Sequence, residues 1–226
     1  PMTVIQGCAA SLQNPQRQFS ESHKQHYLEL IQGAIADMLQ LLDEVLLIGK
    51  TENHGLKYEP AELNLVRFCQ DLTETIQLST FRHKLQFSTQ MQPGLVWMDA
   101  TLLRHILTNL PTNAIKYSPD NATIQFRLSH QADRAVFEIQ DQGIGIPIAD
   151  QPRLFETFHR AGNVGQIQGT GLGLAIVKRC IDLHQGEIDL QSQEGIGTLV
   201  RVVLPTLSHA RFVCQRKAIS SAIHPV

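Results

Sequence analysis

The sequence is poor in cysteine, and its four cysteines (Cys8, Cys69, Cys180 and Cys214) are far apart and lie among apolar neighbours. They show neither the close pairs of a zinc site nor the framework of a disulfide-rich domain. The ten histidines are equally scattered, and no pair has the spacing of a metal-binding helix. We therefore expect reduced, mostly buried thiols in a cytoplasmic protein.

An excess of one charge and long apolar runs are also missing. The 226 residues include 19 Lys and Arg against 21 Asp and Glu, a net charge of -2. This balance predicts no basic surface for nucleic acid, and no run reaches the roughly 18 apolar residues of a membrane span. The hydrophobic fraction of 42% is enough to fill a core. We expect a soluble protein with one ordinary domain and a smaller one.

The N-terminal part reads as a helical hairpin. A first helix over residues 1–14 ends at Asn14 and Pro15, and Ser20 or Ser22 begins a second that runs to about Lys50. One short helix cannot bury the long helix's apolar seam, so we expect a homodimer with a four-helix bundle. Packing of the long helix on its own globular domain is the alternative. The seam consists of Tyr27, Ile31, Ala34, Met38, Leu41, Val45 and Ile48.

A polar stretch over residues 51–60 separates this hairpin, residues 1–55, from a region of mixed pattern. There, Asp99 caps one of three predicted helices, and strands alternate with them. We predict an α+β domain over residues 61–205, a two-layer α/β sandwich, followed by a flexible tail over 206–226. The expected helices are 63–78, 99–117 and 171–184, and the expected strands are 85–89, 95–98, 123–129, 135–140, 187–192 and 198–204.

Glycine clusters mark residues 141–174 as the centre of the sequence. They lie at 143–145, at 162–165 and at 169–173, with a polar, aromatic-flanked segment between the first and the last. Glycine lets backbone amides approach phosphate oxygens without a Cβ in the way. These clusters predict a nucleotide pocket, and residues 160–168 are expected to be a lid that orders over the phosphates.

The order of these elements resembles the catalytic, ATP-binding domain of sensor histidine kinases, the GHKL (Bergerat) fold shared with Hsp90, gyrase B and MutL. Residues 109–119 look like the N box and residues 141–146 like the G1 box. Residues 154–160 look like the F box and residues 169–174 like the G2 box. A single glycine pair would be weak support, whereas these boxes in order are a specific pattern.

The resemblance assigns roles at the phosphates. Asn113 would complete the shell of a magnesium ion, and Lys116 and Tyr117 would place a cation and a hydroxyl beside the phosphates. In the ATPases of this fold, a glutamate at the position of Asn109 activates water. An amide cannot take that proton, so transfer to an imidazole is favoured over hydrolysis.

The resemblance also assigns the base pocket. Asp141 would accept a hydrogen bond from the adenine amino group, and Gly143, Gly145 and Ile146 would close over the base. Thr198, in a third glycine box, would support that pocket.

The G2 and F boxes complete the expected site. Gly169, Thr170, Gly171, Leu172 and Gly173 would lead into a helix whose N-terminal amides face the phosphates. In the F box, Phe155 and Phe158 are expected to pack in the core of the domain and anchor the lid. Arg160 would either reach the phosphates or remain solvated.

Two features depart from the family pattern. Pro1 and Met2 look like the last two positions of the box His-Glu-x-x-Thr-Pro-Leu, with Met in place of Leu. We therefore expect the acceptor histidine just before Pro1. Either the chain is part of a longer sensor kinase, or it is a fragment that can act only in trans. His23, His26 and His54 lack the neighbouring acid and are interpreted as polar helix or linker residues. Pro111 stands where the family has an apolar helix former, and we expect it to kink the helix at a cost of about 3 kcal/mol.

The implied function is that of an ATP- and Mg²⁺-dependent protein-histidine kinase core that passes phosphate to a response-regulator receiver domain. A catalytically silent ATP-binding or dimerisation module is the alternative, favoured by the missing histidine and by Pro111. A GHKL ATPase is a third interpretation, which Asn109 disfavours.

Overall fold

The computed structural model describes residues 2–13, 19–52, 57–92, 94–165, 167 and 169–206. It divides into two compact units, Pro1–Leu56 and Lys57–Val226. The expected flexible tail lies outside the described residues from residue 207 onward, as does Cys214. In the described part of the chain, no helix is both long and apolar enough to cross a membrane.

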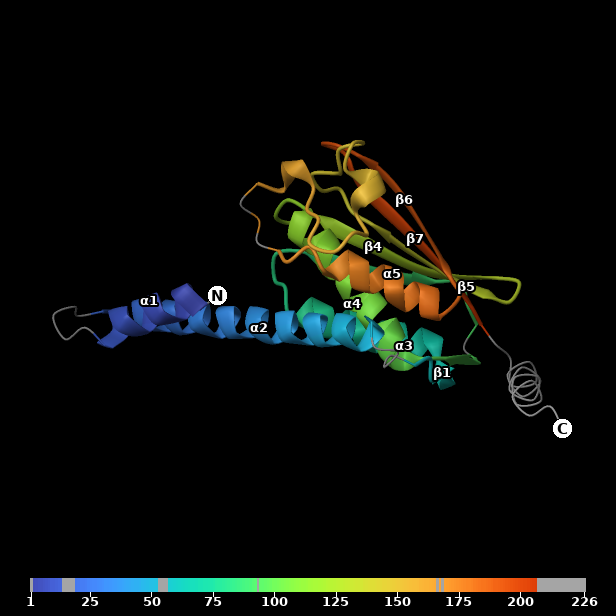
Figure 1. Ribbon diagram of the computed structural model, residues 1–226, viewed down its shortest axis with the longest axis horizontal. Coiled ribbons are helices and arrows are strands. Elements are labelled where there is room, and N and C mark those ends of the chain that lie inside the picture. Colours follow the sequence, from blue (N-terminus) through green and yellow to red (C-terminus); the bar gives the residue numbers. More distant parts are fainter. Residues whose placement is uncertain are drawn as a thin grey trace. The chain divides into compact units, whose positions relative to one another are not determined.

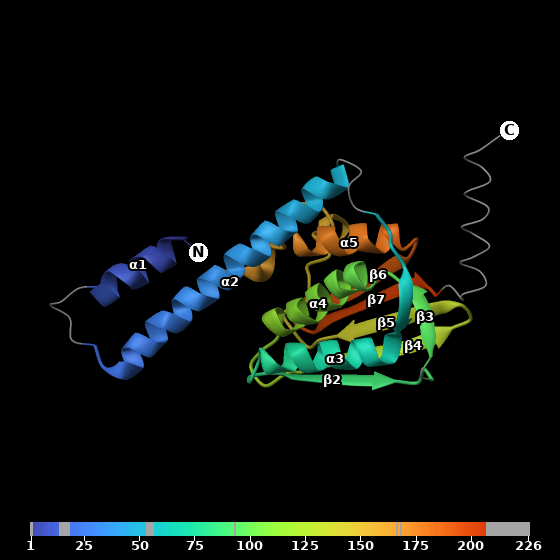
Figure 2. The ribbon, with the colours of Figure 1, turned by 90° about the horizontal axis from the view of Figure 1, so that it is seen from below.

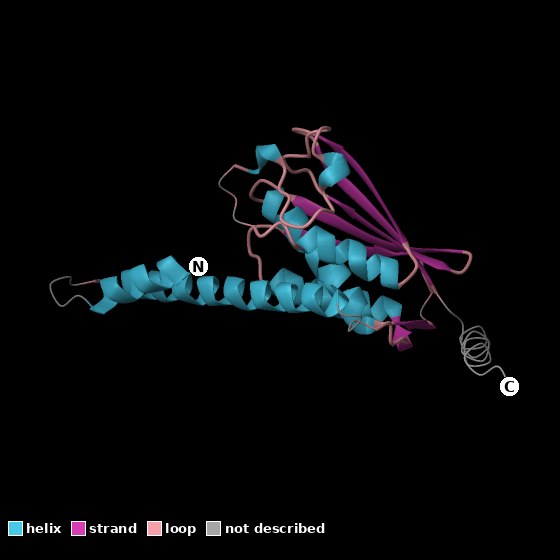
Figure 3. Ribbon diagram, viewed as in Figure 1, coloured by secondary structure: helices cyan, strands magenta, loops and turns pink. Residues whose placement is uncertain are grey.

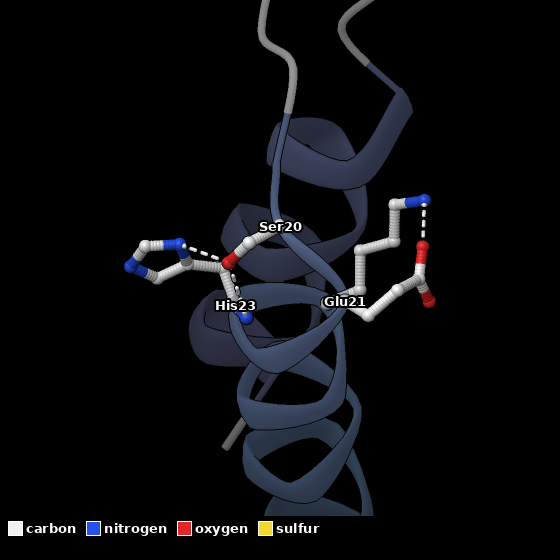
Figure 4. Close-up of polar contacts among 4 residues, drawn as sticks. Ser20, Glu21 and His23 are labelled. Atoms are coloured by element: carbon white, nitrogen blue, oxygen red, sulfur yellow. Dashed lines mark hydrogen bonds and ion pairs between the residues drawn. The ribbon is translucent and has the colours of Figure 1, made fainter.

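The first unit is a helical hairpin of α1 (Met2–Gln13) and α2 (Glu21–Glu52), which lie side by side (Figure 2). Ser20 precedes α2, and its Oγ accepts a 3.4 Å hydrogen bond from the backbone N–H of His23 and lies 2.9 Å from His23 Nδ1 (Figure 4). Glu21 accepts a 2.7 Å bond from Lys24 Nζ in the same turn. Ser20, one of the two expected residues, therefore begins the helix.

The apolar seam of α2 is only partly covered within one chain. Ala34 of the seam and Cys8 of α1 are buried, whereas Met38 of the seam is 37% exposed and Val45 is 53% exposed. The side chain of Ile48 falls outside the described set. The other large apolar side chains described as exposed on α2 are Leu28, Leu30, Ile35, Leu42 and Leu46.

The second unit is built on a mixed five-stranded sheet with helices on one face (Figures 1 and 3). Its edge strand β2 runs parallel to β4, and all other neighbours are antiparallel. The strand order is β2 (Lys84–Thr89), β4 (Thr123–Gln131), β5 (Arg134–Gln140), β7 (Gly197–Pro205) and β6 (Glu187–Gln193). The covering helices are α3 (Leu65–Leu78), α4 (Ala100–Tyr117) and α5 (Gly173–Leu183).

The core lies between these two layers. Phe126 and Ile139 are paired in register, and Ile139 is paired with Val200 on the next strand. Phe126 is 1% exposed, and Ile106 and Leu107 on α4 are fully buried. Alternation along the strands thus places one apolar face against the helices, which confirms the predicted α+β two-layer sandwich.

A second, two-stranded sheet was not predicted. It pairs β1 (Ala61–Asn64) with β3 (Leu95–Met98), so β3 does not pair with β2 despite their closeness in sequence. Such pairing is non-local, and the turn residues between β2 and β3 do not determine it. The start of the helix predicted over residues 63–78 is corrected as well, because Leu63 belongs to β1 and Asn64 caps α3.

Helix α4 begins where the sequence predicts and continues through Pro111. Asp99 caps it through hydrogen bonds that its Oδ1 accepts from the backbone N–H groups of Thr101 (2.9 Å) and Leu102 (3.0 Å). The helix runs through Pro111 without interruption, and Thr112 Oγ1 donates to the Thr108 carbonyl in the same turn at 2.7 Å. The proline is thus accommodated inside the helix.

Candidate nucleotide-binding site

The C-terminal half of α4 presents the two predicted asparagines. Asn109 and Asn113 are four residues apart and lie on one helix face. Asn109 Nδ2 donates to the His105 carbonyl at 3.0 Å, and its Oδ1 lies 2.6 Å from the point where a Cβ on Gly173 would be. The Asn113 side-chain amide has no hydrogen bond to any described residue, so it is available to a ligand.

The end of α4 meets the start of the G2 segment. A Cβ placed on Gly169 would be 2.8 Å from Lys116 Nζ and 3.7 Å from Tyr117 Oη. Burial raises the pKa of Tyr117, and the nearby positive charge of Arg160 partly opposes this shift. The Arg160 guanidinium itself donates to the carbonyl of Ile167. The structure therefore brings Lys116 and Tyr117 beside Gly169, with Arg160 close enough to act on Tyr117.

The N-terminus of α5 lacks a side-chain cap. Its N-cap residue is Leu172, whose own N–H donates to Thr170 Oγ1 at 3.1 Å. Gly171 has a φ of +72°, and a Cβ on it would be 2.7 Å from the backbone carbon of Phe158. An uncapped helix N-terminus presents backbone N–H groups and the positive end of the helix dipole, which together bind anions.

Asp141 directly follows β5. Its Oδ1 accepts hydrogen bonds from the backbone N–H groups of Gly143 at 2.8 Å and Thr198 at 3.1 Å. None of the described residues donates to Oδ2. Burial raises the pKa of Asp141, and the two backbone bonds partly oppose this shift. The second carboxylate oxygen can therefore accept a hydrogen bond from a ligand amino group.

The G1 loop that follows Asp141 is clamped between two elements. The backbone N–H of Ile144 donates to the carbonyl of Tyr117 at 3.1 Å, at the end of α4. On the other side, Gly145 has a φ of +62°, and a Cβ on it would be 2.0 Å from the carbonyl of Gln193. Ile146 donates through its backbone N–H to Ser192 Oγ at 2.9 Å. The loop is thus fixed against both α4 and the β6–β7 turn.

Ser192 is a supporting residue that sequence reasoning missed. Its Oγ also donates to the carbonyl of Gly197 at 3.0 Å and lies 2.8 Å from Thr198 Oγ1. Ser192 thereby joins the predicted Thr198 to the G1 loop. Ser192 ends the predicted strand 187–192 and Thr198 begins the predicted strand 198–204, and this proximity in sequence was the available indication.

The expected packing of Phe158 is wrong. Its ring is 72% exposed, whereas Leu154 is the buried member of the F box and Phe155 is half-buried. Phe158 has a φ of +63°, and its backbone N–H donates to the Gly171 carbonyl at 3.0 Å. The chain turns at this residue, so its backbone makes the anchor and its ring points outward.

The side chains of this site suit a magnesium ion that is bound mainly by phosphates and water, and not a metal ion that is held by protein ligands alone. Among the described residues, no group of three or more His, Cys, Asp and Glu could hold a metal ion. Magnesium is commonly bound by one or two protein oxygens, with phosphates and water supplying the rest. The side-chain amide of Asn113, which precedes Lys116 by three residues on α4 and has no hydrogen bond to a described residue, fits that arrangement.

Known proteins resemble this chain in sequence. Residues 98–208 match the family described as histidine kinase-, DNA gyrase B-, and HSP90-like ATPase. The circadian input-output histidine kinase CikA of Thermosynechococcus vestitus is 31% identical over 214 residues, which are 92% of this chain and 29% of CikA. The adaptive-response sensory kinase SasA of the same organism is 33% identical over 174 residues, or 76% of this chain and 46% of SasA. The chain thus spans less than half the length of these relatives.

Solved structures show the same fold. The mycobacterial sensor histidine kinase MprB matches with a TM-score of 0.59 at 27% identity, covering 65% of this chain and 98% of that one. The catalytic domain of histidine kinase ThkA matches with a TM-score of 0.57 at 25% identity, over 65% of this chain and 95% of its own.

Proposed function

This chain carries a histidine kinase-, DNA gyrase B-, and HSP90-like ATPase domain of the kind found in sensor histidine kinases, and on that premise we propose that it binds ATP with Mg²⁺ and transfers the γ-phosphoryl group to a histidine. The observation that carries the proposal is that the end of α4, with Lys116 and Tyr117, contacts both the G1 loop that follows Asp141 and Gly169 of the segment that leads into the uncapped α5. A base acceptor at one end and phosphate-binding groups at the other suit an adenine nucleotide.

The adenine end depends on hydrogen-bond direction. Asp141 Oδ1 is occupied by two backbone donors, which fix the carboxylate plane and leave Oδ2 to accept from the adenine amino group. Guanine has a carbonyl oxygen at that position, so two acceptors would face each other. Asp141 thereby favours ATP over GTP.

The phosphate end depends on positive charge and N–H donors. Lys116 supplies a cation, and the first turn of α5 supplies backbone N–H groups to the phosphate oxygens. Magnesium, when bound, neutralises phosphate charge, and Asn113 Oδ1 would be its protein ligand.

Asn109 favours transfer of the γ-phosphoryl group to a histidine over hydrolysis of ATP. Its amide nitrogen is bonded to the His105 carbonyl, and an amide cannot accept a proton from water at neutral pH. Hydrolysis is therefore slow, and the γ-phosphoryl group is kept for a stronger nucleophile such as a histidine imidazole. From that histidine the group would pass to an aspartate of a response-regulator receiver domain.

The proposed organisation has residues 1–55 as part of a dimerisation hairpin, residues 61–205 as the catalytic domain and residues 206–226 as a flexible tail. The exposed apolar residues of α2, Met38 and Val45 among them, support pairing of two hairpins in a four-helix bundle.

A test for transfer uses labelled ATP and a separate hairpin that carries the box His-Glu-x-x-Thr-Pro-Leu. Acid-labile label on the hairpin, absent when its histidine is replaced by alanine, is the result expected of a kinase. Free phosphate without labelled hairpin would instead indicate an ATPase. Bound but unconverted ATP would support the silent module, which Pro111 inside α4 favours.

A further inference from the structure

The predicted lid, residues 160–168, lies between Phe158 and Gly171, which contact each other. The backbone N–H of Phe158 donates to the Gly171 carbonyl at 3.0 Å, and a Cβ on Gly171 would be 2.7 Å from the Phe158 backbone. This contact fixes the two ends of the lid. Between these ends, the described residues make bonds within the segment, such as that from Arg160 to the Ile167 carbonyl, and bonds to neighbouring segments.

The first half of the lid makes hydrogen bonds to the segment that follows Asp141. The backbone N–H of Gly162 donates to Asp150 Oδ2 at 2.7 Å. One residue on, Asn163 Nδ2 donates to the Gly145 carbonyl at 3.0 Å and also lies 3.5 Å from the Ile144 carbonyl. These carbonyls belong to the G1 loop, which is the proposed adenine-binding loop. At the other end of the lid, Gly169 adjoins Lys116 of the phosphate site.

Hydrogen bonding determines the orientation of the Asn163 side-chain amide. Its Nδ2 faces two carbonyl oxygens, so turning the amide would place Oδ1 against two acceptors. In the present orientation Oδ1 is buried and has no hydrogen-bond partner among the described residues. A buried carbonyl without a partner is costly. The bonds of the N–H₂ group offset this cost and hold the side chain in place.

The carbonyl that Asn163 binds belongs to a rigid loop. Gly145 is fixed by the close approach of Gln193, and Ile144 accepts a second bond, 2.8 Å long, from the N–H of Gly195. We propose that Asn163 is a positioning residue that docks the lid on the adenine-binding loop, an inference that rests on the proposed nucleotide function. Docking of the lid then adds affinity for the β- and γ-phosphates, while a ligand without them gains nothing from it.

The test compares the affinity of the chain for AMP with that for a nonhydrolysable ATP analogue, by calorimetry with magnesium. In the unaltered chain the analogue binds more tightly than AMP. In Asn163→Ala this ratio is expected to fall about two- to ten-fold, the range of one lost hydrogen bond, with AMP affinity unchanged. Asn163→Asp keeps the side chain's size and removes its donors, so it guards against a cavity effect and should lower the ratio at least as much.

Glu187→Gln is the matched control, because Glu187 begins β6 outside the expected site and its carboxylate pairs with Arg134 in an exposed position. Its ratio should equal that of the unaltered chain. The inference would be overturned if both Asn163 variants kept the affinity ratio of the unaltered chain. It would also be overturned if they lost affinity for AMP and for the analogue equally, because Asn163 would then support only the adenine-binding loop. Failure of the unaltered chain to bind either nucleotide would instead overturn the proposed function, and the inference with it.

Discussion

At the residue scale, the proposed nucleotide preference depends most on Asp141. Asp141→Asn keeps the shape of the side chain, but its amide can place an N–H₂ group where the adenine amino group needs an acceptor. We expect affinity for an ATP analogue to fall at least ten-fold and the preference for ATP over GTP to narrow, as measured by calorimetry. Asp120→Asn, at an exposed ion pair with Arg82, is the control and should bind as the unaltered chain does. An unchanged nucleotide preference in Asp141→Asn would contradict the assignment.

A second residue prediction separates backbone strain from steric clash at the G1 loop. Gly145 and Gly195 both have positive φ, +62° and +77°, but only at Gly145 would a Cβ meet a backbone atom, 2.0 Å away. Gly195→Ala should cost about 1 kcal/mol of unfolding free energy, and Gly145→Ala clearly more, because a clash with the β6–β7 turn is added. Urea denaturation measures both. Equal losses in the two variants would show that the clash is relieved without cost.

Individual residues could be predicted from sequence where one local rule determines them. Asp99 precedes an apolar helical pattern, and the structure confirms that it caps α4. Ser192 and Asn163 were missed because their bonds join segments far apart in the chain, to Ile146 and Gly145. Phe158 was misjudged because an aromatic residue is usually buried, whereas here the positive φ of its backbone turns the ring outward.

At the element scale, Pro111 makes α4 weaker than the same helix with leucine at this position. The proline removes the backbone N–H that would bond to the carbonyl of Leu107, between the two asparagines of the site. Pro111→Leu should strengthen magnesium-ATP binding by several-fold and raise the unfolding free energy. A calorimetric titration of both chains, together with thermal melting, provides the check. Equal affinity would mean that α4 already holds Asn109 and Asn113 in the binding geometry.

The C-terminus of α5 gives a pH prediction. His184 is 4% exposed, and burial lowers its pKa below the ordinary 6.5, although the Cys180 carbonyl, at 2.8 Å from Nδ1, partly opposes the shift. The unfolded chain therefore binds a proton near pH 6.5 that the folded chain binds only at lower pH. The stability from neutral His184 is complete above pH 6.5 and declines as pH falls below it towards the folded pKa.

Urea denaturation between pH 7.5 and pH 5.5 measures this decline. In His184→Gln, the loss of unfolding free energy across the same range should be smaller than in the unaltered chain. The same loss in both proteins would show that other histidines cause the pH dependence.

Helices and strands could be predicted from periodicity, but their partners could not. The alternating pattern of β4 and β5 and the turn between them determine a hairpin, and the structure contains it. The pairing of β2 with β4 depends on a connection through β3 and α4, which no local pattern specifies. Position in the sheet is a property of the assembled core.

At the scale of the whole molecule, the hairpin predicts a dimer. One chain leaves Met38 and Val45 of the α2 seam exposed, and a second copy would cover them. Light scattering should give twice the chain mass of 25.3 kDa, and Val45→Glu should shift the protein to monomer. Gln32→Glu, at an exposed position off the seam, is the control. A monomer at high concentration in the unaltered chain would contradict the bundle.

The most direct test of the central claim is a crystal structure with magnesium and a nonhydrolysable ATP analogue. The account predicts the adenine amino group within hydrogen-bond distance of Asp141 Oδ2. The triphosphate should lie between Lys116 and the first turn of α5, with magnesium on Asn113. An analogue bound elsewhere, or these side chains directed away from it, would contradict the account.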